Sequence, residues 1–130
     1  MDLSTILETP KFLKYFKLYA THEFSVENVI FWEEVQNYKK LKEKERNENA
    51  DKIIDAFMKD DSIYEINTTQ KLIKQMEEEK KKECHEEIFD PIVKDVKNTN
   101  MMDTYQRFLS SALYKEMMEK KRKKTYFLFQ

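Results

Sequence analysis

The chain has 130 residues, of which 40% are hydrophobic and 38% are charged, and its formal net charge is −1. This length predicts a single domain over residues 1–130, and the near-neutral charge gives no electrostatic reason to expect nucleic-acid binding. Average usage would give roughly nine glycines, but the sequence has none, which argues against phosphate-binding loops, dinucleotide folds and tight hairpins.

Cysteine usage and hydropathy point to the cell interior. Cys84 is the only cysteine, so no internal disulfide can form and a reducing compartment is the default. No apolar run approaches the ~20 residues of a membrane span, and no signal peptide is visible. We expect a soluble, intracellular, all-α domain of seven to nine helices.

The first 44 residues predict three helices. Residues 3–7 indicate a short one, and Pro10 suits the first turn of a second. The main helix is predicted from Ser25, a preferred N-cap type, to about residue 44. The polar side chains at its entrance, Ser25, Glu27 and Asn28, could build a recognition surface on a rigid edge.

The middle of the chain predicts a turn, two helices and a loop. Residues 43–49 are polar and predict a turn, and the apolar spacing of residues 50–58 predicts a helix. Residues 62–67 predict an extended loop anchored by Ile63 and Ile66. Asn67 ends this loop, just before a plausible N-cap at Thr68-Thr69, and suits a simple turn former as well as a functional group.

The last third predicts two more helices and a basic tail. Asp90-Pro91 suits the start of the first, which residues 98–100 are expected to break. The final helix is predicted from residues 101–103 through Met117. The tail, K-K-R-K-K and then T-Y-F-L-F-Q at 120–130, could make weak contact with an anionic membrane, but a helix end that frays or packs its aromatic residues on the bundle is favoured.

No catalytic or metal site is evident in the sequence. Cys84 and His85 are adjacent but have no partners at metal-ligand spacing and no orienting group for proton transfer. There is no paired-carboxylate site or phosphate cradle, so we predict no cofactor, no metal and no enzymatic activity of the chain's own. A function in trans would work through a surface.

Three patterns together resemble the RGS domain, the regulator of G-protein signalling module. They are E-F-S-V-E-N-V-I-F-W-E-E-V-Q-N-Y-K at 23–39, Y-E-I-N at 64–67, and F-D-P-I-V through D-T-Y-Q-R-F-L-S-S-A-L-Y at 89–114. The resemblance covers about residues 10–118. It implies a nine-helix fold, with a central antiparallel four-helix bundle and a smaller bundle of terminal helices. The residues implied to be core are Phe31, Trp32, Phe89, Phe108 and Leu109.

The resemblance also implies an activity and a partner. Family members accelerate GTP hydrolysis by G-protein α subunits (Gα), whose switch regions they stabilise in the transition-state arrangement. The positions implied to contact the switch regions are Ser25, Glu27, Asn28, Asn67, Thr99, Asp103, Thr104 and Arg107, with Asp103 and Arg107 as i,i+4 neighbours. We expect a monomer, cytoplasmic and at the inner face of the plasma membrane when active, and a domain taken from a longer protein.

Several positions depart from the family pattern. Thr99 stands where many members have a leucine that packs on the G protein, which predicts a weaker contact. Leu72-Ile73 replaces a Thr-Arg pair that braces the asparagine loop, which predicts a looser loop. These departures leave open an alternative, in which the chain docks Gα or another partner without accelerating hydrolysis.

Overall fold

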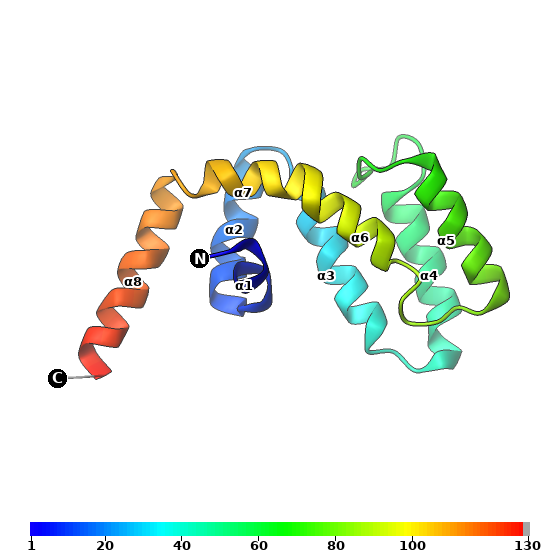
Figure 1. Ribbon diagram of the computed structural model, residues 1–130, viewed down its shortest axis with the longest axis horizontal. Helices are drawn as coiled ribbons and strands as arrows, with labels where there is room; N and C mark the ends of the chain where they lie inside the picture. The colour runs from blue at the N-terminus through cyan, green and yellow to red at the C-terminus, as the bar shows by residue number, and fades with distance from the viewer. Residues whose placement is uncertain (129–130) are drawn as a thin grey trace. The chain divides into compact units, whose positions relative to one another are not determined.

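The computed structural model describes the backbone of residues 1–128 and the side chains of residues 1–124. Within this part of the chain there is no strand, and the all-α prediction is confirmed. The described residues form eight α-helices and one π-helical turn, and Figure 1 shows the course of the α-helices. They are α1 (Leu3–Glu8), α2 (Pro10–His22), α3 (Glu27–Lys39), α4 (Glu43–Phe57), α5 (Gln70–Lys82), α6 (Asp90–Val96), η1 (Lys97–Met101), α7 (Met102–Phe108) and α8 (Ala112–Leu128).

The chain forms two compact units. The terminal unit is Met1–Val26 together with Met102–Gln130, and the central unit is Glu27–Met101. In the central unit α3 packs against α4 and α6, and α6 packs against α5. Lys80 Nζ on α5 lies 2.9 Å from Asp51 Oδ1 on α4, which closes the group of four helices. Successive helices α3, α4 and α5 run in opposite directions, as expected for an antiparallel bundle (Figure 1).

Aromatic rings fill the core of the central unit. Phe31 and Phe57 lie with ring centroids 5.4 Å apart, and Tyr38 and Phe89 with centroids 5.1 Å apart, both edge to face. Such pairs add to the free energy gained from burial alone. Trp32, predicted to be core, is only partly buried.

The hydroxyl of Tyr38 covers the single cysteine. It donates a hydrogen bond to the His85 carbonyl oxygen at 2.6 Å and lies 3.3 Å from Cys84 Sγ. Burial, and then the neighbouring thiol, raise the pKa of Tyr38. Arg46 Nε donates to the Cys84 carbonyl oxygen at 2.8 Å. Cys84 is therefore buried in a fixed polar setting.

The terminal unit is organised around α2, which packs against α1, α7 and α8. Phe108 of α7 is fully buried at its centre, and its ring centroid lies 5.3 Å from that of Phe16, 5.5 Å from Tyr19 and 5.3 Å from Tyr114. Leu109, also predicted to be core, is only partly buried. Helix α2 from the start of the sequence and helices α7 and α8 from its end thus share one aromatic cluster.

Three helix boundaries differ from the prediction. Residues 43–49 form the first half of α4 and not a turn, because Glu43 and Glu45 suit the first turn and no residue there breaks a helix. Residues 98–100 do not end the helical structure, because they belong to the π-helical turn η1, which follows α6 directly and is followed directly by α7. The main helix α3 ends at Lys39, earlier than expected.

The predicted final helix is two helices. The break lies at residues 109–111, where Ser111 Oγ accepts a hydrogen bond from Tyr114 N at 3.0 Å and donates one to the Phe108 carbonyl oxygen at 2.6 Å. A serine that satisfies backbone groups in this way competes with a continuous helix. Residues 125–130 of the tail, to which the predictions of membrane contact and of aromatic packing apply, lie outside the described side chains.

Candidate recognition surface

In the central unit, Asn67 is presented on a loop that is fixed on both sides of it. The preceding residue, Ile66, is buried and its N–H donates to the Phe57 carbonyl oxygen at 2.9 Å. The following residue, Thr68, donates from Oγ1 to Asp95 Oδ2 of α6 at 2.8 Å. Asn67 itself is exposed. The Asn67 side chain is therefore exposed to solvent, while hydrogen bonds of the residues on either side restrain its backbone.

One of the two predicted anchors of this loop is wrong. Ile66 is 6% exposed, but Ile63 is 92% exposed and anchors nothing. The predicted cap after the loop is confirmed, because Thr69 Oγ1 accepts a hydrogen bond from Leu72 N at 3.2 Å. The loop thus enters α5 through a standard N-cap.

Asp95 also holds a second candidate residue, Thr99. The Thr99 hydroxyl, in η1, donates to the Asp95 carbonyl oxygen at 2.8 Å, while the Asp95 carboxylate receives Thr68. The structure therefore ties the Asn67 loop and Thr99 to the same residue of α6. Sequence reasoning missed Asp95, because nothing in the sequence pairs it with a residue 27 positions away.

The entrance of α3 carries Glu27 and Asn28. Glu27 is the first residue of the helix and is partly exposed, whereas Asn28 is only 3% exposed. Any contact that Asn28 makes with a partner would use the small part that reaches the surface.

In the terminal unit, Ser25 and Thr104 meet. Their hydroxyl oxygens lie 3.2 Å apart, and Ser25 Oγ also lies 3.4 Å from the Ala20 carbonyl oxygen, to which it donates. Thr104 is 2% exposed, so its methyl and hydroxyl groups lie inside the unit. The pair joins the end of α2 to α7.

Arg107 pairs with Glu23, not with its predicted neighbour Asp103. Arg107 Nε and Nη2 each lie 2.9 Å from Glu23 Oε1, and the Tyr19 hydroxyl donates to Glu23 Oε2. The hydrogen bond from Arg107 lowers the pKa of Glu23, and burial followed by the bond to Glu23 raises the pKa of Tyr19. Asp103 is exposed and adds a weaker attraction to the guanidinium.

Phe24, which lies in the sequence between Glu23 and Ser25, has an unusual backbone conformation and an exposed side chain. Its side chain is 92% exposed and its φ is 58°, in the left-handed region. For a bulky side chain this conformation is a genuine outlier. In a sequence without glycine, the tight turn after α2 falls on an aromatic residue.

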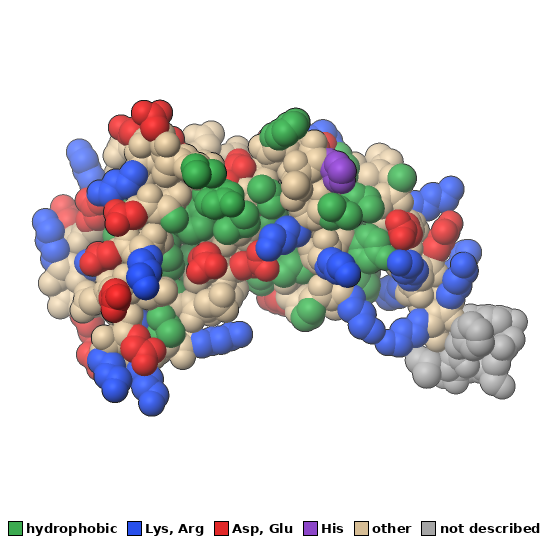
Figure 2. All heavy atoms as spheres, turned by 180° about the vertical axis from the view of Figure 1, so that it is seen from behind, with side chains coloured by type: hydrophobic (Ala, Val, Ile, Leu, Met, Phe, Trp, Pro, Cys, Tyr) green, Lys and Arg blue, Asp and Glu red, His purple; other side chains and the backbone are tan. Residues whose placement is uncertain are grey.

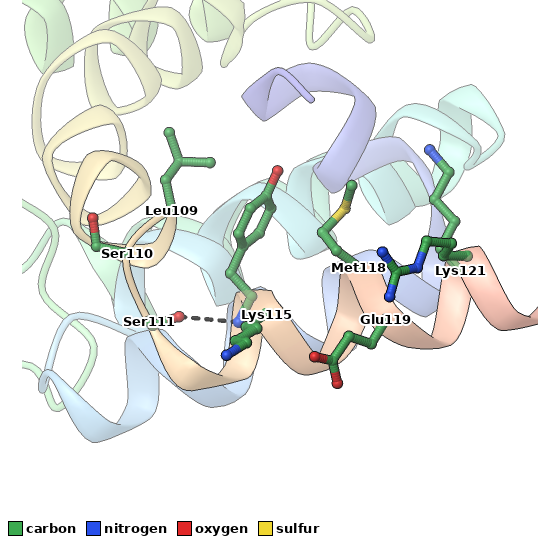
Figure 3. A pocket seen from close by; sticks show the side chains of 9 residues that line it. Leu109, Ser110, Ser111, Lys115, Met118, Glu119 and Lys121 are labelled. Atoms are coloured by element: carbon green, nitrogen blue, oxygen red, sulfur yellow. Dashed lines mark hydrogen bonds between the residues drawn. The ribbon is translucent and has the colours of Figure 1, made fainter.

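Two features of the described residues bear on the candidate positions, namely metal-binding groups and pockets. No group of three or more His, Cys, Asp and Glu side chains among them could hold a metal ion. A cavity of about 790 Å³ lies at the turn between α7 and α8, and Figure 3 shows Leu109, Met118 and Lys121 on its walls. None of the eight candidate residues is among those that line it. None of the described helices is long and apolar enough to cross a membrane.

Comparison with known proteins identifies the family. The family model described as "Regulator of G protein signaling domain" matches residues 2–117. The chain is 31% identical over 114 residues to Regulator of G-protein signaling 10 of Rattus norvegicus, which covers 87% of this chain and 62% of that protein. It therefore spans less than two thirds of that relative.

Two further relatives carry similar names. The chain is 31% identical over 121 residues to Regulator of G-protein signaling 21 of Homo sapiens, covering 90% of this chain and 77% of that protein. It is 31% identical over 109 residues to Regulator of G-protein signaling loco of Drosophila melanogaster, covering 83% of this chain and 7% of that protein.

Proposed function

The chain belongs to the regulator of G protein signaling (RGS) family, and from this premise we propose that it is a GTPase activator for Gα. It binds the switch regions of GTP-loaded Gα and stabilises their transition-state arrangement. Gα supplies an arginine in cis and a water-orienting glutamine. The proposal therefore assigns no catalytic residue to this chain, and its partner is Gα.

The observation that carries the proposal is the setting of Asn67. An amide can donate to and accept from a switch loop without adding charge beside the nucleotide. Its two neighbours are held, Ile66 by Phe57 and Thr68 by Asp95, although the family's Thr-Arg brace is replaced by Leu72-Ile73. A positioning group on a held backbone loses little entropy on binding.

The terminal unit supplies a second set of proposed contacts. Asp103 and Arg107 would shape the surface that receives a switch-I threonine. The ion pair with Glu23 limits the orientations of the Arg107 guanidinium, and the contact with Ser25 fixes Thr104 beneath that surface. Glu27 and Asn28 would contribute from the entrance of α3.

One observation favours the docking alternative. Thr99 replaces an apolar side chain and its hydroxyl is already bonded to the Asp95 carbonyl oxygen. It therefore offers less apolar area to a partner than leucine would, and apolar area contributes about 25 cal/mol per Å². A weaker contact of this kind reduces the affinity for Gα.

Single-turnover GTP hydrolysis by a panel of Gα subunits tests the proposal. The domain should accelerate hydrolysis by at least one Gα, and Asn67→Ala should reduce the acceleration by about tenfold or more, the factor for one lost charge-free contact of roughly 1.4 kcal/mol. Asn47 is an exposed asparagine elsewhere, in α4. Asn47→Ala is therefore the matched control and should leave the acceleration of GTP hydrolysis unchanged.

Two results would change the conclusion. If the domain binds the transition-state-mimicking form of Gα but never accelerates hydrolysis, it is a docking module. If acceleration occurs but Asn67→Ala and Asn47→Ala behave alike while both remain folded by circular dichroism, the surface has been placed wrongly.

A further inference from the structure

A cavity lined by lysines lies between α2 and α8 in the terminal unit. It has a volume of about 490 Å³. Lys11 and Lys14 reach it from α2, and Lys120, Lys121 and Lys124 reach it from α8. Several of the Lys and Arg side chains seen in Figure 2 lie next to the end of the chain that is drawn in grey, and others are spread over the rest of the visible face. Among the described residues that line the cavity there is no aspartate or glutamate.

Aromatic rings form part of its wall and hold two of the ammonium groups in place. Lys120 Nζ lies 5.5 Å from the centre of the Tyr15 ring, and Lys121 Nζ lies 5.7 Å from that of Phe12. Cation–π contacts of this length are attractive. Lys120 also lies 3.3 Å from Glu116 Oε1, one helical turn earlier. The lysines are therefore arranged around an apolar wall.

Lys11 and Lys124 lie close enough to disturb each other. The pKa of Lys11 is lowered, first by a hydrogen bond with Lys124 and then by repulsion from its charge. No carboxylate of the described residues forms an ion pair with either ammonium. An anion placed between the two ammonium groups would offset this repulsion, because an opposite charge nearby favours the charged form of each lysine.

We propose that this cavity binds a compact, multiply phosphorylated group. Lysine ammonium groups bind phosphate as point charges, and charge-assisted hydrogen bonds to phosphate are stronger than neutral ones. A site between about 300 and 1,000 Å³ is of the size that small ligands occupy, so the volume suits a phosphorylated ring better than one phosphate ion. The group could be a lipid headgroup or a free inositol phosphate.

This proposal goes beyond the proposed function and does not depend on it, because it is tested without Gα. Titration calorimetry would measure binding of inositol trisphosphate. Co-sedimentation would measure binding to phosphatidylcholine vesicles that contain phosphatidylinositol bisphosphate. Vesicles with phosphatidylserine at equal charge and a polyglutamate peptide test whether any anion suffices.

The decisive variant is Lys11→Gln with Lys124→Gln. We expect affinity for the phosphorylated probe to fall about a hundredfold, roughly tenfold for each charge-assisted contact. Lys42→Gln with Lys44→Gln, two exposed lysines before and in α4, changes the net charge equally and should have little effect. Thermal unfolding without ligand would verify that both double variants are folded.

The outcomes separate the sources and the alternatives. Binding of free inositol trisphosphate that depends on Lys11 and Lys124 supports a soluble ligand, and binding of the bisphosphate vesicles alone supports a lipid headgroup. Equal binding of phosphatidylserine vesicles or polyglutamate would overturn the proposal, as would equal losses in both double variants. No binding of either phosphorylated probe would also overturn it.

Discussion

Replacing Thr68 with valine tests whether the loop that carries Asn67 is held by α6. The change keeps the size of the side chain but removes the hydroxyl that donates to Asp95 Oδ2 at 2.8 Å. A hydrogen bond to a charged group contributes about 1.5–3 kcal/mol. Both side chains are partly exposed, so water can replace the lost partner, and we expect the free energy of unfolding to fall by about 1 kcal/mol.

Urea unfolding measures this loss. The midpoint should decrease with no change in the slope, and the melting temperature should fall by about 4 °C, as roughly expected for 1 kcal/mol in a domain of this size. Amide exchange should accelerate at residues 66–69 more than elsewhere in the central unit. If the proposed function holds, acceleration of GTP hydrolysis should weaken although Asn67 is intact.

Thr21→Val is the matched control. Its hydroxyl also donates at 2.8 Å, but to the Lys17 carbonyl oxygen within an exposed turn of α2. Such bonds within a helix add little stability, so the change should stay within about 0.5 kcal/mol. An unchanged urea midpoint and unchanged exchange at residues 66–69 in Thr68→Val would show that the bond to Asp95 does not hold the loop.

Three further predictions concern the terminal unit. Phe24→Gly should raise the free energy of unfolding by about 0.5 kcal/mol, because relief of the left-handed strain exceeds the entropy cost of glycine; a lower urea midpoint would contradict this. The pKa of Glu23 is lowered mainly by Arg107, so the stability from this pair is present above the ordinary value of 4.5 and is lost as the pH falls through the lower folded-state pKa. Glu23→Gln should accordingly flatten the acid side of a plot of melting temperature against pH, and an unaltered plot would rule out this role. Phe108→Ala should lower the free energy of unfolding by about 3–5 kcal/mol through loss of buried ring contacts, measured by urea unfolding, and a loss below about 1 kcal/mol would mean that the cluster is not the core of this unit.

Local chemistry made part of this fold predictable. Pro10 and Pro91 fix the starts of α2 and α6, and Thr69 caps α5, because each acts on backbone groups a few residues away. The apolar spacing of residues 50–57 likewise predicts the buried face of α4. These features need no knowledge of the distant chain.

The errors arise where distant or competing interactions decide. The polar residues 43–49 are helical because they join a helix that is fixed by its buried second half. Of the candidate site, residue types could be assigned from the motifs, but the partners that hold them could not. Arg107 forms its ion pair with Glu23, the C-cap residue of α2, although Asp103 is one turn away in α7, and Thr68 forms its hydrogen bond with Asp95.

The rate at which a thiol reagent labels the buried Cys84 measures how often the surrounding structure opens. Thiol reagents attack an exposed thiolate, whereas Cys84 is only 7% exposed and its Sγ lies 3.3 Å from the Tyr38 hydroxyl oxygen. Because Cys84 is the only cysteine of the sequence and lies in the central unit, the labelling rate reports the opening of that unit in the unmodified protein. Openings confined to the terminal unit would leave it unchanged, so this thiol separates two kinds of fluctuation that a global melting curve averages.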